Sequence, residues 1–269
     1  MNRAQTSGRV AVGGGEKGVR GHRLAIAALL IALAALPFVT ASAAAQSDIE
    51  FDPAITQQEF STFSRLLAQG IYATPVDAAR ARGLLGFDVG VGATALPVDT
   101  GAAYWLRSTG DDFSIADHVV VPKLFGSKGL SFATVSAVYS KVPDTDIQVW
   151  GASVDVPIMN GGIVKPTVAV RGAYAIILGV DELDMSTYGL EVFISKAFGP
   201  VTPYAAAGIA RSDSTATITL PTGTRSLTDQ SHSTRITIGA KLSLLLPKII
   251  VEVTQGEVRS YAAKVSLGL

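Results

Sequence analysis

Histidine, serine and acidic side chains are the residues of this chain that could do hydrolytic chemistry, and they fall into two groups. The first comprises Asp111, Asp112, Asp117 and His118. A carboxylate beside an imidazole can hold a water molecule and accept its proton, which is general base catalysis. No second acidic group on another predicted strand pair matches this one. The sequence therefore favours a non-catalytic role for His118, at the rim of the β-structure that is predicted below.

The second group is His232 between Ser231 and Ser233. A serine hydroxyl activated by a histidine is the nucleophile of many hydrolases. Adjacent residues of a β-strand, however, point to opposite faces of the sheet. The pattern therefore favours an ordinary strand over a serine–histidine pair.

Composition excludes several other kinds of site. The chain has no cysteine, so it has no disulfide, no thiolate metal site and no cysteine nucleophile. A lipoprotein-type anchor on cysteine is excluded for the same reason. No zinc-ligand spacing and no nucleotide-binding motif occurs, and we expect neither a cofactor nor a metal.

Charged residues recur on one face of a series of strands and form the main candidate site. Alternation with a period of two places them opposite Val, Ile and Leu. Charges enclosed in a narrow barrel must be paired or hydrated, because an isolated buried charge is costly. We favour a salt-bridged interior that holds the barrel shut; a polar path for small solutes is the alternative. The predicted lumen charge network consists of Asp88, Asp155, Arg171, Glu191, Arg235, Lys241, Glu252 and Lys264.

The same alternation predicts β-strands from residue 84 to residue 269. Val89 and Val91, for example, alternate with Gly90 and Gly92. Bacterial single-chain barrels have an even number of strands; we expect about ten, with eight or twelve left open. The predicted strands cover residues 84–96, 117–125, 130–141, 146–158, 163–178, 185–197, 201–213, 231–246, 248–255 and 257–269.

The connections between these strands sort by length. Segments 97–116 and 214–230 are long, and longer loops face outward in outer-membrane barrels. Both termini of the barrel chain are then expected on the periplasmic side. A soluble β-sandwich would also alternate, but its turns would not be expected to sort into short and long sets. The predicted tight turns are Gly126–Gly129, Met159–Gly162, Ala197–Pro200 and Leu246–Lys248.

The N-terminus has the features of a secretory signal peptide. Basic residues precede the apolar run Leu24–Val39, and Ala41–Ala45 offers small residues at the spacing of a cleavage site. The run is shorter than the ~20 apolar residues that a membrane-spanning helix needs. We therefore expect residues 1–45 to be removed on export. The remainder has 17 basic and 21 acidic residues, a net charge of −4, which argues against nucleic acid as a partner.

Residues 46–83 are predicted to form a short helical segment before the barrel. Asp52 followed by Pro53 fits an N-cap with proline at the first helical position, and Gly70 fits the C-terminal end. Residues 74–82 are predicted to form a second short helix. The apolar face of the first helix needs a partner, so the segment is expected in the barrel mouth, in the lumen or along the periplasmic rim.

The last strand resembles that of a known class of proteins. Tyr261, Val265, Leu267 and Leu269 form its apolar face. This ending resembles the C-terminal strand of bacterial outer-membrane β-barrel proteins, which the barrel-assembly machinery reads, although that class usually ends in an aromatic residue. The resemblance implies that these four residues are an assembly signal, and that outer-membrane lipid and the assembly machinery are partners. The stretch Thr74–Val91 is also similar to uncharacterised Gram-negative outer-membrane barrels, which implies no activity.

These patterns together predict an all-β fold, a transmembrane antiparallel up-and-down barrel over residues 84–269. We expect a non-enzymatic outer-membrane protein that passes small solutes at most or serves a structural role. The alternative is an outer-membrane hydrolase. The acid–histidine group is similar to that of omptin-type proteases, which are ten-stranded barrels, and the serine–histidine group is similar to that of outer-membrane lipid acylhydrolases. The oligomeric state stays open.

Replacing Leu269 by lysine tests the assembly signal. A charge on the lipid face of a barrel costs ~2–4 kcal/mol at the membrane midplane and less near the interface, so the folded state of this variant should lose little. The yield of folded barrel should nevertheless fall clearly, because the terminal strand loses its apolar last residue. Gel mobility with and without heating measures the folded fraction, and a wild-type fraction would contradict the prediction.

Overall fold

The structure is a computed structural model that describes residues 49–72, 74–109, 118–141, 146–162 and 164–269. The predicted signal peptide, residues 1–45, lies outside the described residues, and so do Asp111, Asp112 and Asp117.

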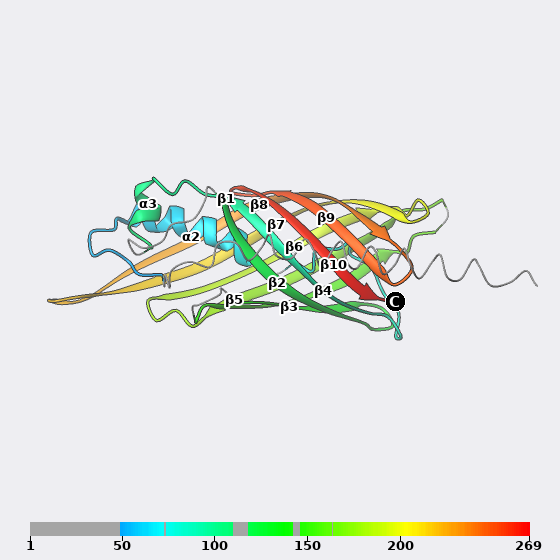
Figure 1. Ribbon diagram of the computed structural model, residues 1–269, viewed down its shortest axis with the longest axis horizontal. Coiled ribbons are helices and arrows are strands. Elements are labelled where there is room, and N and C mark those ends of the chain that lie inside the picture. The colour runs from blue at the N-terminus through cyan, green and yellow to red at the C-terminus, as the bar shows by residue number, and fades with distance from the viewer. Residues whose placement is uncertain (1–48, 73, 110–117, 142–145, 163) are drawn as a thin grey trace, which may run out of the picture.

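Ten antiparallel strands form a closed barrel (Figure 1). Each strand pairs with its neighbour in the sequence, and β1 (Phe87–Pro97) closes the ring by pairing with β10 (Arg259–Gly268). The predicted all-β up-and-down barrel of ten strands is thus confirmed. The other strands are β2 (His118–Gly129), β3 (Thr134–Lys141), β4 (Gln148–Met159), β5 (Thr167–Leu178), β6 (Leu183–Ser195), β7 (Val201–Leu220), β8 (Gly223–Ser243) and β9 (Pro247–Gln255).

The two ends of the barrel differ. The C-terminus lies at the end where the β2–β3, β4–β5, β6–β7 and β8–β9 connections also lie, which we call the turn end. The opposite end, which we call the loop end, carries the remaining connections. There the hairpin of β7 and β8 extends well beyond the other strands (Figure 1).

That hairpin corrects the predicted loop 214–230. Strands β7 and β8 pair continuously to Leu220 and Gly223, and only residues 221 and 222 turn. Ala216, Ile218 and Leu227 are buried while the residues between them are not. The segment is rich in threonine, a β-branched residue that favours strands. Its polar composition suggested a loop, but its alternation decides the structure.

Two predicted turns are also corrected. The turn predicted at Gly126–Gly129 belongs to β2, and the chain reverses at residues 130–133 instead. A Cβ on Gly129 would lie 2.0 Å from the carbonyl oxygen of Gly83, so this glycine permits a close approach of the N-terminal segment rather than a turn. Similarly, Pro247 and Lys248 begin β9 instead of ending a turn.

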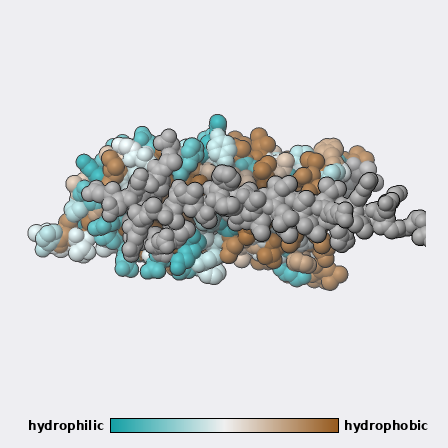
Figure 2. All heavy atoms as spheres, in the orientation of Figure 1, coloured by the Kyte–Doolittle hydropathy of each residue, from teal (hydrophilic) through white to brown (hydrophobic). Residues whose placement is uncertain are grey.

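Apolar side chains cover much of the exterior. On the face shown in Figure 2, hydrophobic residues gather toward the turn end and hydrophilic ones toward the loop end. The predicted assembly residues Tyr261, Val265, Leu267 and Leu269 all lie on the outward face of the last strand or directly after it. The Leu269 amide donates to the Phe87 carbonyl at 3.0 Å, which continues the β1–β10 seam to the end of the chain.

Helix α2 (Gln57–Ile71) begins at a capping box. The Glu59 amide donates to the Thr56 hydroxyl at 3.3 Å, and the Thr56 amide donates to the Glu59 carboxylate at 2.8 Å. The Thr56 hydroxyl also donates to this carboxylate at 2.9 Å, and these two hydrogen bonds from the Thr56 amide and hydroxyl hold the pKa of Glu59 below its ordinary value. The N-cap is therefore Thr56, and the predicted N-cap, Asp52, is wrong. Residues 74–82 contain no helix, so the second predicted helix is wrong.

Residues 49–72 and 74–86, which we call the plug, run through the barrel from one end to the other (Figure 1). At the loop end the Phe51 amide donates to the Glu182 carboxylate at 3.0 Å. At the turn end the Gly129 amide donates to the Gly86 carbonyl at 2.9 Å. The chain then enters β1, so the plug is continuous with the strand that closes the barrel.

Aromatic packing holds the loop-end half of the plug. The Phe51 ring lies edge-on to Phe60 and Phe63, with centroids 5.6 and 5.9 Å away. Trp105 of the short helix α3 (Ala103–Leu106) lies 6.0 Å from Phe63. These side chains are almost fully buried and close the loop end with an apolar cluster. Neither α2 nor α3 is long and apolar enough to cross a membrane.

Replacing Thr56 by alanine should loosen the plug without harming the barrel. Loss of an N-cap costs about 1 kcal/mol, so amides in the first turns of α2 should exchange about fivefold faster with solvent deuterium. Thr62→Ala is the matched control, because Thr62 is exposed on the same helix and bonds only the helix's own Gln58 carbonyl. Equal exchange in the two variants would contradict the capping role.

Candidate functional site in the plugged lumen

The eight residues of the predicted lumen charge network all point into the barrel. Each is buried, and the most exposed, Glu252, retains only 8 % of its accessible surface. They come from seven strands, β1, β4, β5, β6, β8, β9 and β10. Three of the expected acid–base pairs form within the set, while Lys241 and Glu252 find partners outside it.

Arg171 and Asp155 form the most regular pair. They lie opposite each other on β5 and β4. The Arg171 Nε and Nη2 atoms donate to the two Asp155 carboxylate oxygens at 2.7 and 2.9 Å, the bidentate geometry that arginine favours. The guanidinium also lies 4.3 Å from the centroid of the Phe193 ring, a cation–π contact. Phe193 interrupts the polar face of β6 because it supports this arginine.

Asp88 joins three strands to the plug. Its carboxylate lies 3.0 Å from Lys264 Nζ and 2.9 Å from Lys248 Nζ. The Ser266 hydroxyl donates to it at 3.2 Å, and Arg82 of the plug donates at 3.4 Å. Strands β1, β9 and β10 therefore meet the plug at a single buried carboxylate beside the seam of the barrel.

Asp77 has the matching role within the plug. Its carboxylate accepts from Lys241 of β8 at 2.7 Å and forms an ion pair with Arg82. Its main-chain carbonyl accepts from Arg171 of β5 at 3.0 Å. Lys264 of β10 donates to the Pro75 carbonyl at 3.0 Å. The barrel wall thus holds the plug by its main chain as well as by its charges.

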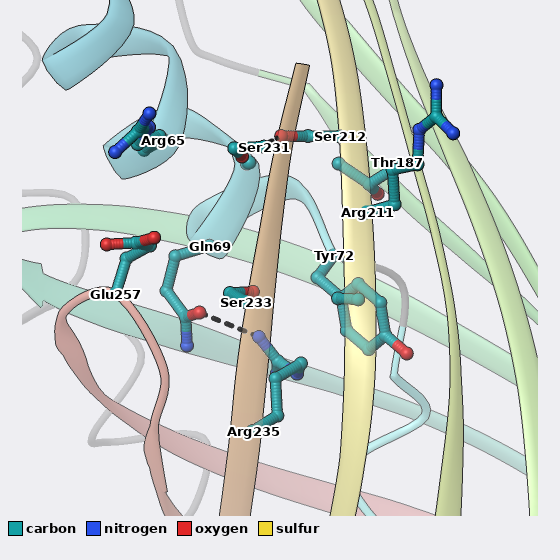
Figure 3. Close-up of a pocket in the computed structure, with 12 residues that line it drawn as sticks. Arg65, Gln69, Tyr72, Thr187, Arg211, Ser212, Ser231, Ser233, Arg235 and Glu257 are labelled. Atoms are coloured by element: carbon teal, nitrogen blue, oxygen red, sulfur yellow. Dashed lines mark hydrogen bonds between the residues drawn. The ribbon is translucent and has the colours of Figure 1, made fainter.

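Arg235 and Glu191 meet across a glycine. Their Nε and Oε1 atoms lie 3.5 Å apart, with Gly208 between them in the sheet register. A Cβ on Gly208 would lie 2.7 Å from Glu191 Cγ, so the missing side chain lets the pair form. Figure 3 shows the plug side of this site, where Arg235 donates to Gln69 at 2.7 Å and lies 4.0 Å from the Tyr72 ring centroid.

Glu252 is paired by a hydrogen bond rather than by a cation. The Tyr204 hydroxyl of β7 donates to its carboxylate at 2.8 Å. Gly239 lies between the two residues in the register, and a Cβ there would lie 2.3 Å from the Tyr204 ring. A glycine on the lumen face of the middle strand therefore leaves space for side chains of the two flanking strands to meet across it.

Sequence reasoning missed several lumen residues for different reasons. Lys248 is in phase with Glu252 and was missed because Leu246–Lys248 was predicted to be a turn. The register of Lys123, which is buried, is obscured by the unbroken run Val119–Val121. Some plug residues that contact the wall have no periodic pattern that could reveal them; Tyr72, Asp77, Arg80 and Arg82 are among them.

A small cavity lies beside the C-terminal part of α2. It has a volume of about 10 Å³ and lies beside Gln69, Tyr72 and Arg235 (Figure 3). That volume holds about one water molecule. This cavity therefore offers no room for a solute.

The two histidine groups considered for catalysis do not form sites among the described residues. His118 begins β2 at the loop end with an exposed side chain, and its acidic partners lie outside the described residues. His232 points outward, whereas Ser231 points inward and bonds Ser212 at 2.7 Å between hydroxyl oxygens. No group of three metal-ligating side chains occurs in the described part of the chain.

No protein family and no curated protein matches this sequence. Among solved structures, the chain is similar to Ail, the attachment invasion locus protein of Yersinia pestis. The structure of Ail in complex with the heparin analogue sucrose octasulfate is 11 % identical, covers 68 % of this chain and 94 % of its own, and gives a TM-score of 0.26. A second Ail structure is 10 % identical, covers 68 % of this chain and 93 % of its own, and gives a TM-score of 0.26. A likeness this low has no bearing on function.

Replacing Arg171 by alanine should leave the Asp155 carboxylate buried without its partner. Breaking a buried ion pair in this way costs on the order of 3–5 kcal/mol. We expect a lower thermal midpoint, or water drawn into the lumen and a measurable conductance in planar bilayers. Arg259→Ala is the control, because Arg259 is exposed on the outer face. An Arg171→Ala barrel with wild-type stability and no conductance would contradict the closed, charge-paired interior.

Proposed function

We propose that this protein is a non-enzymatic barrel of the Gram-negative outer membrane, closed by its own N-terminal segment. It would serve a structural role or pass small solutes at most. The observation that carries the proposal is the inversion of polarity across the wall: a charged, hydrogen-bonded interior and an apolar exterior.

The exterior supports a membrane location. Outward positions of neighbouring strands carry aliphatic side chains such as Leu190, Val192 and Ile194, each about half exposed. Contiguous apolar surface of this kind is rare on soluble monomers. Phenylalanines 87, 132 and 198 are exposed near the turn end, as in the aromatic girdles of transmembrane barrels. Figure 2 is consistent with a belt displaced toward the turn end, with a polar portion beyond it.

The interior supports a closed state. The plug fills the lumen from the apolar cluster at the loop end to Asp88 at the turn end. It is held by residues of β1, β3, β5, β8 and β10. Barrels whose lumen is filled by a helix or loop do not act as general diffusion pores.

Membrane fractionation and planar-bilayer recording test this proposal. The protein should pellet with outer membranes, migrate faster on gels when unheated, and give no large, stable conductance. Recovery in the soluble periplasm would contradict the membrane location. A large, stable conductance from the unmodified protein would instead show that the plug leaves the lumen and that a diffusion pore is the better answer.

An outer-membrane hydrolase is the alternative from the sequence. Purified protein should show no hydrolysis of peptides or phospholipids above the level of the His118→Ala and His232→Ala variants. Activity lost in either variant would favour the hydrolase, and the variant that loses it would identify the group responsible.

A further inference from the structure

The outer wall of the barrel carries a hollow that the function proposed above does not use. Its volume is about 720 Å³, and it lies over β4, β5, β6 and β7 with His232 of β8 at one edge. The floor is formed where side chains are small, at Ala152 and Gly172. No atom lies within 4 Å of a Cβ built on Gly172. The missing side chain therefore leaves open space in an otherwise aliphatic surface.

The sheet register orders the residues around this hollow into two rows. Val154, Gly172, Leu190 and Ile209 lie opposite one another on successive strands and form an apolar row. One step nearer the loop end, a second row runs across the same strands and is aromatic and basic. It consists of Ala152, Tyr174, Tyr188, Arg211 and His232.

On β6, β7 and β8 the second row marks where the apolar surface ends. On these strands the next outward row toward the loop end contains Ser186, Asp213 and Gln230, whereas on β4 and β5 the same row holds Trp150 and Ile176, so the apolar surface continues there. Tyrosine and arginine at such a boundary are typical of the membrane interface, because each has an apolar body and a polar tip. The hollow thus opens toward the hydrocarbon on one side and toward the headgroup level on the other.

Contacts with Asp213 and Tyr188 orient the Arg211 guanidinium at this boundary. Its Nε and Nη2 atoms donate to Asp213 Oδ1 at 3.2 and 3.0 Å, and its guanidinium carbon lies 5.9 Å from the Tyr188 ring centroid. These contacts leave Nη1, and arginine has five N–H donors in all. His232 lies directly opposite Arg211 on β8. Phosphate is the anion whose geometry suits an arginine fork.

We propose that this hollow binds one lipid of the surrounding membrane, with an acyl chain over Gly172 and a phosphate-bearing, anionic headgroup at Arg211 and His232. The inference rests on the proposed membrane location. Charge selects the occupant: an uncharged chain alone would not need the basic edge, and a free anion would not need the apolar floor.

Tryptophan fluorescence can test this site in bilayers. The chain has two tryptophans; Trp150 lies outward on β4 two residues from Ala152, while Trp105 is 4 % exposed within the apolar cluster. Lipids with brominated acyl chains quench a tryptophan that they touch. The Trp150→Phe variant gives the background from Trp105.

Brominated phosphatidylglycerol should compete for the site about fivefold better than brominated phosphatidylcholine, the effect of one basic residue near an anionic lipid. Arg211→Gln and His232→Gln should each reduce this preference, and Gly172→Leu should abolish it by filling the hollow. Gly126→Leu and Arg259→Gln are matched controls on other strands. Gly126 is also free of atoms within 4 Å of a built Cβ, and Arg259 is exposed.

Equal quenching by the two lipids in the wild-type protein would overturn the lipid site, and so would equal effects of Gly172→Leu and Gly126→Leu. A dimer in detergent that Gly172→Leu converts to a monomer would assign the hollow to a second copy of the chain and overturn it as well. If neither lipid quenches Trp150 at all, the membrane location fails rather than the choice of lipid.

Discussion

The need to satisfy charge inside a narrow, closed wall is the constraint on which this structure depends. Asp88 and Asp77 illustrate this constraint best. Asp88 belongs to the first strand and Asp77 to the plug, and each forms ion pairs with cations from other elements. Neither the barrel nor the plug satisfies its charges alone. A lumen without the plug would leave Lys241 without its carboxylate, so the plug is part of the interior and not an accessory to it.

The barrel could be predicted from the sequence because its signal is repetitive. Alternation assigns the inward and outward faces residue by residue, and it placed Arg171, Glu191 and Lys264 on the face where the structure has them. Turn positions were harder, since a glycine such as Gly129 serves a close approach that resembles turn chemistry in sequence alone.

The plug illustrates what local patterns cannot predict. Residues 74–82 have proline and helix-compatible spacing, yet they form no helix because their partners are distant in the sequence. Arg82 donates its amide to Thr134, and Thr134 donates to the Arg80 carbonyl. Such contacts replace the internal hydrogen bonds of a helix, and no window of neighbouring residues contains them. The same is true of the pairs that meet across Gly208 and Gly239.

The path of the plug also bears on how the molecule can be built. The segment starts at the loop end, passes along the lumen and becomes β1 at the turn end. Once β1 has joined β10, this segment could be added only by drawing the chain that precedes it through the whole length of the lumen. This path favours an assembly in which closing and filling are coupled, so that the last seam forms around a chain that is already in place.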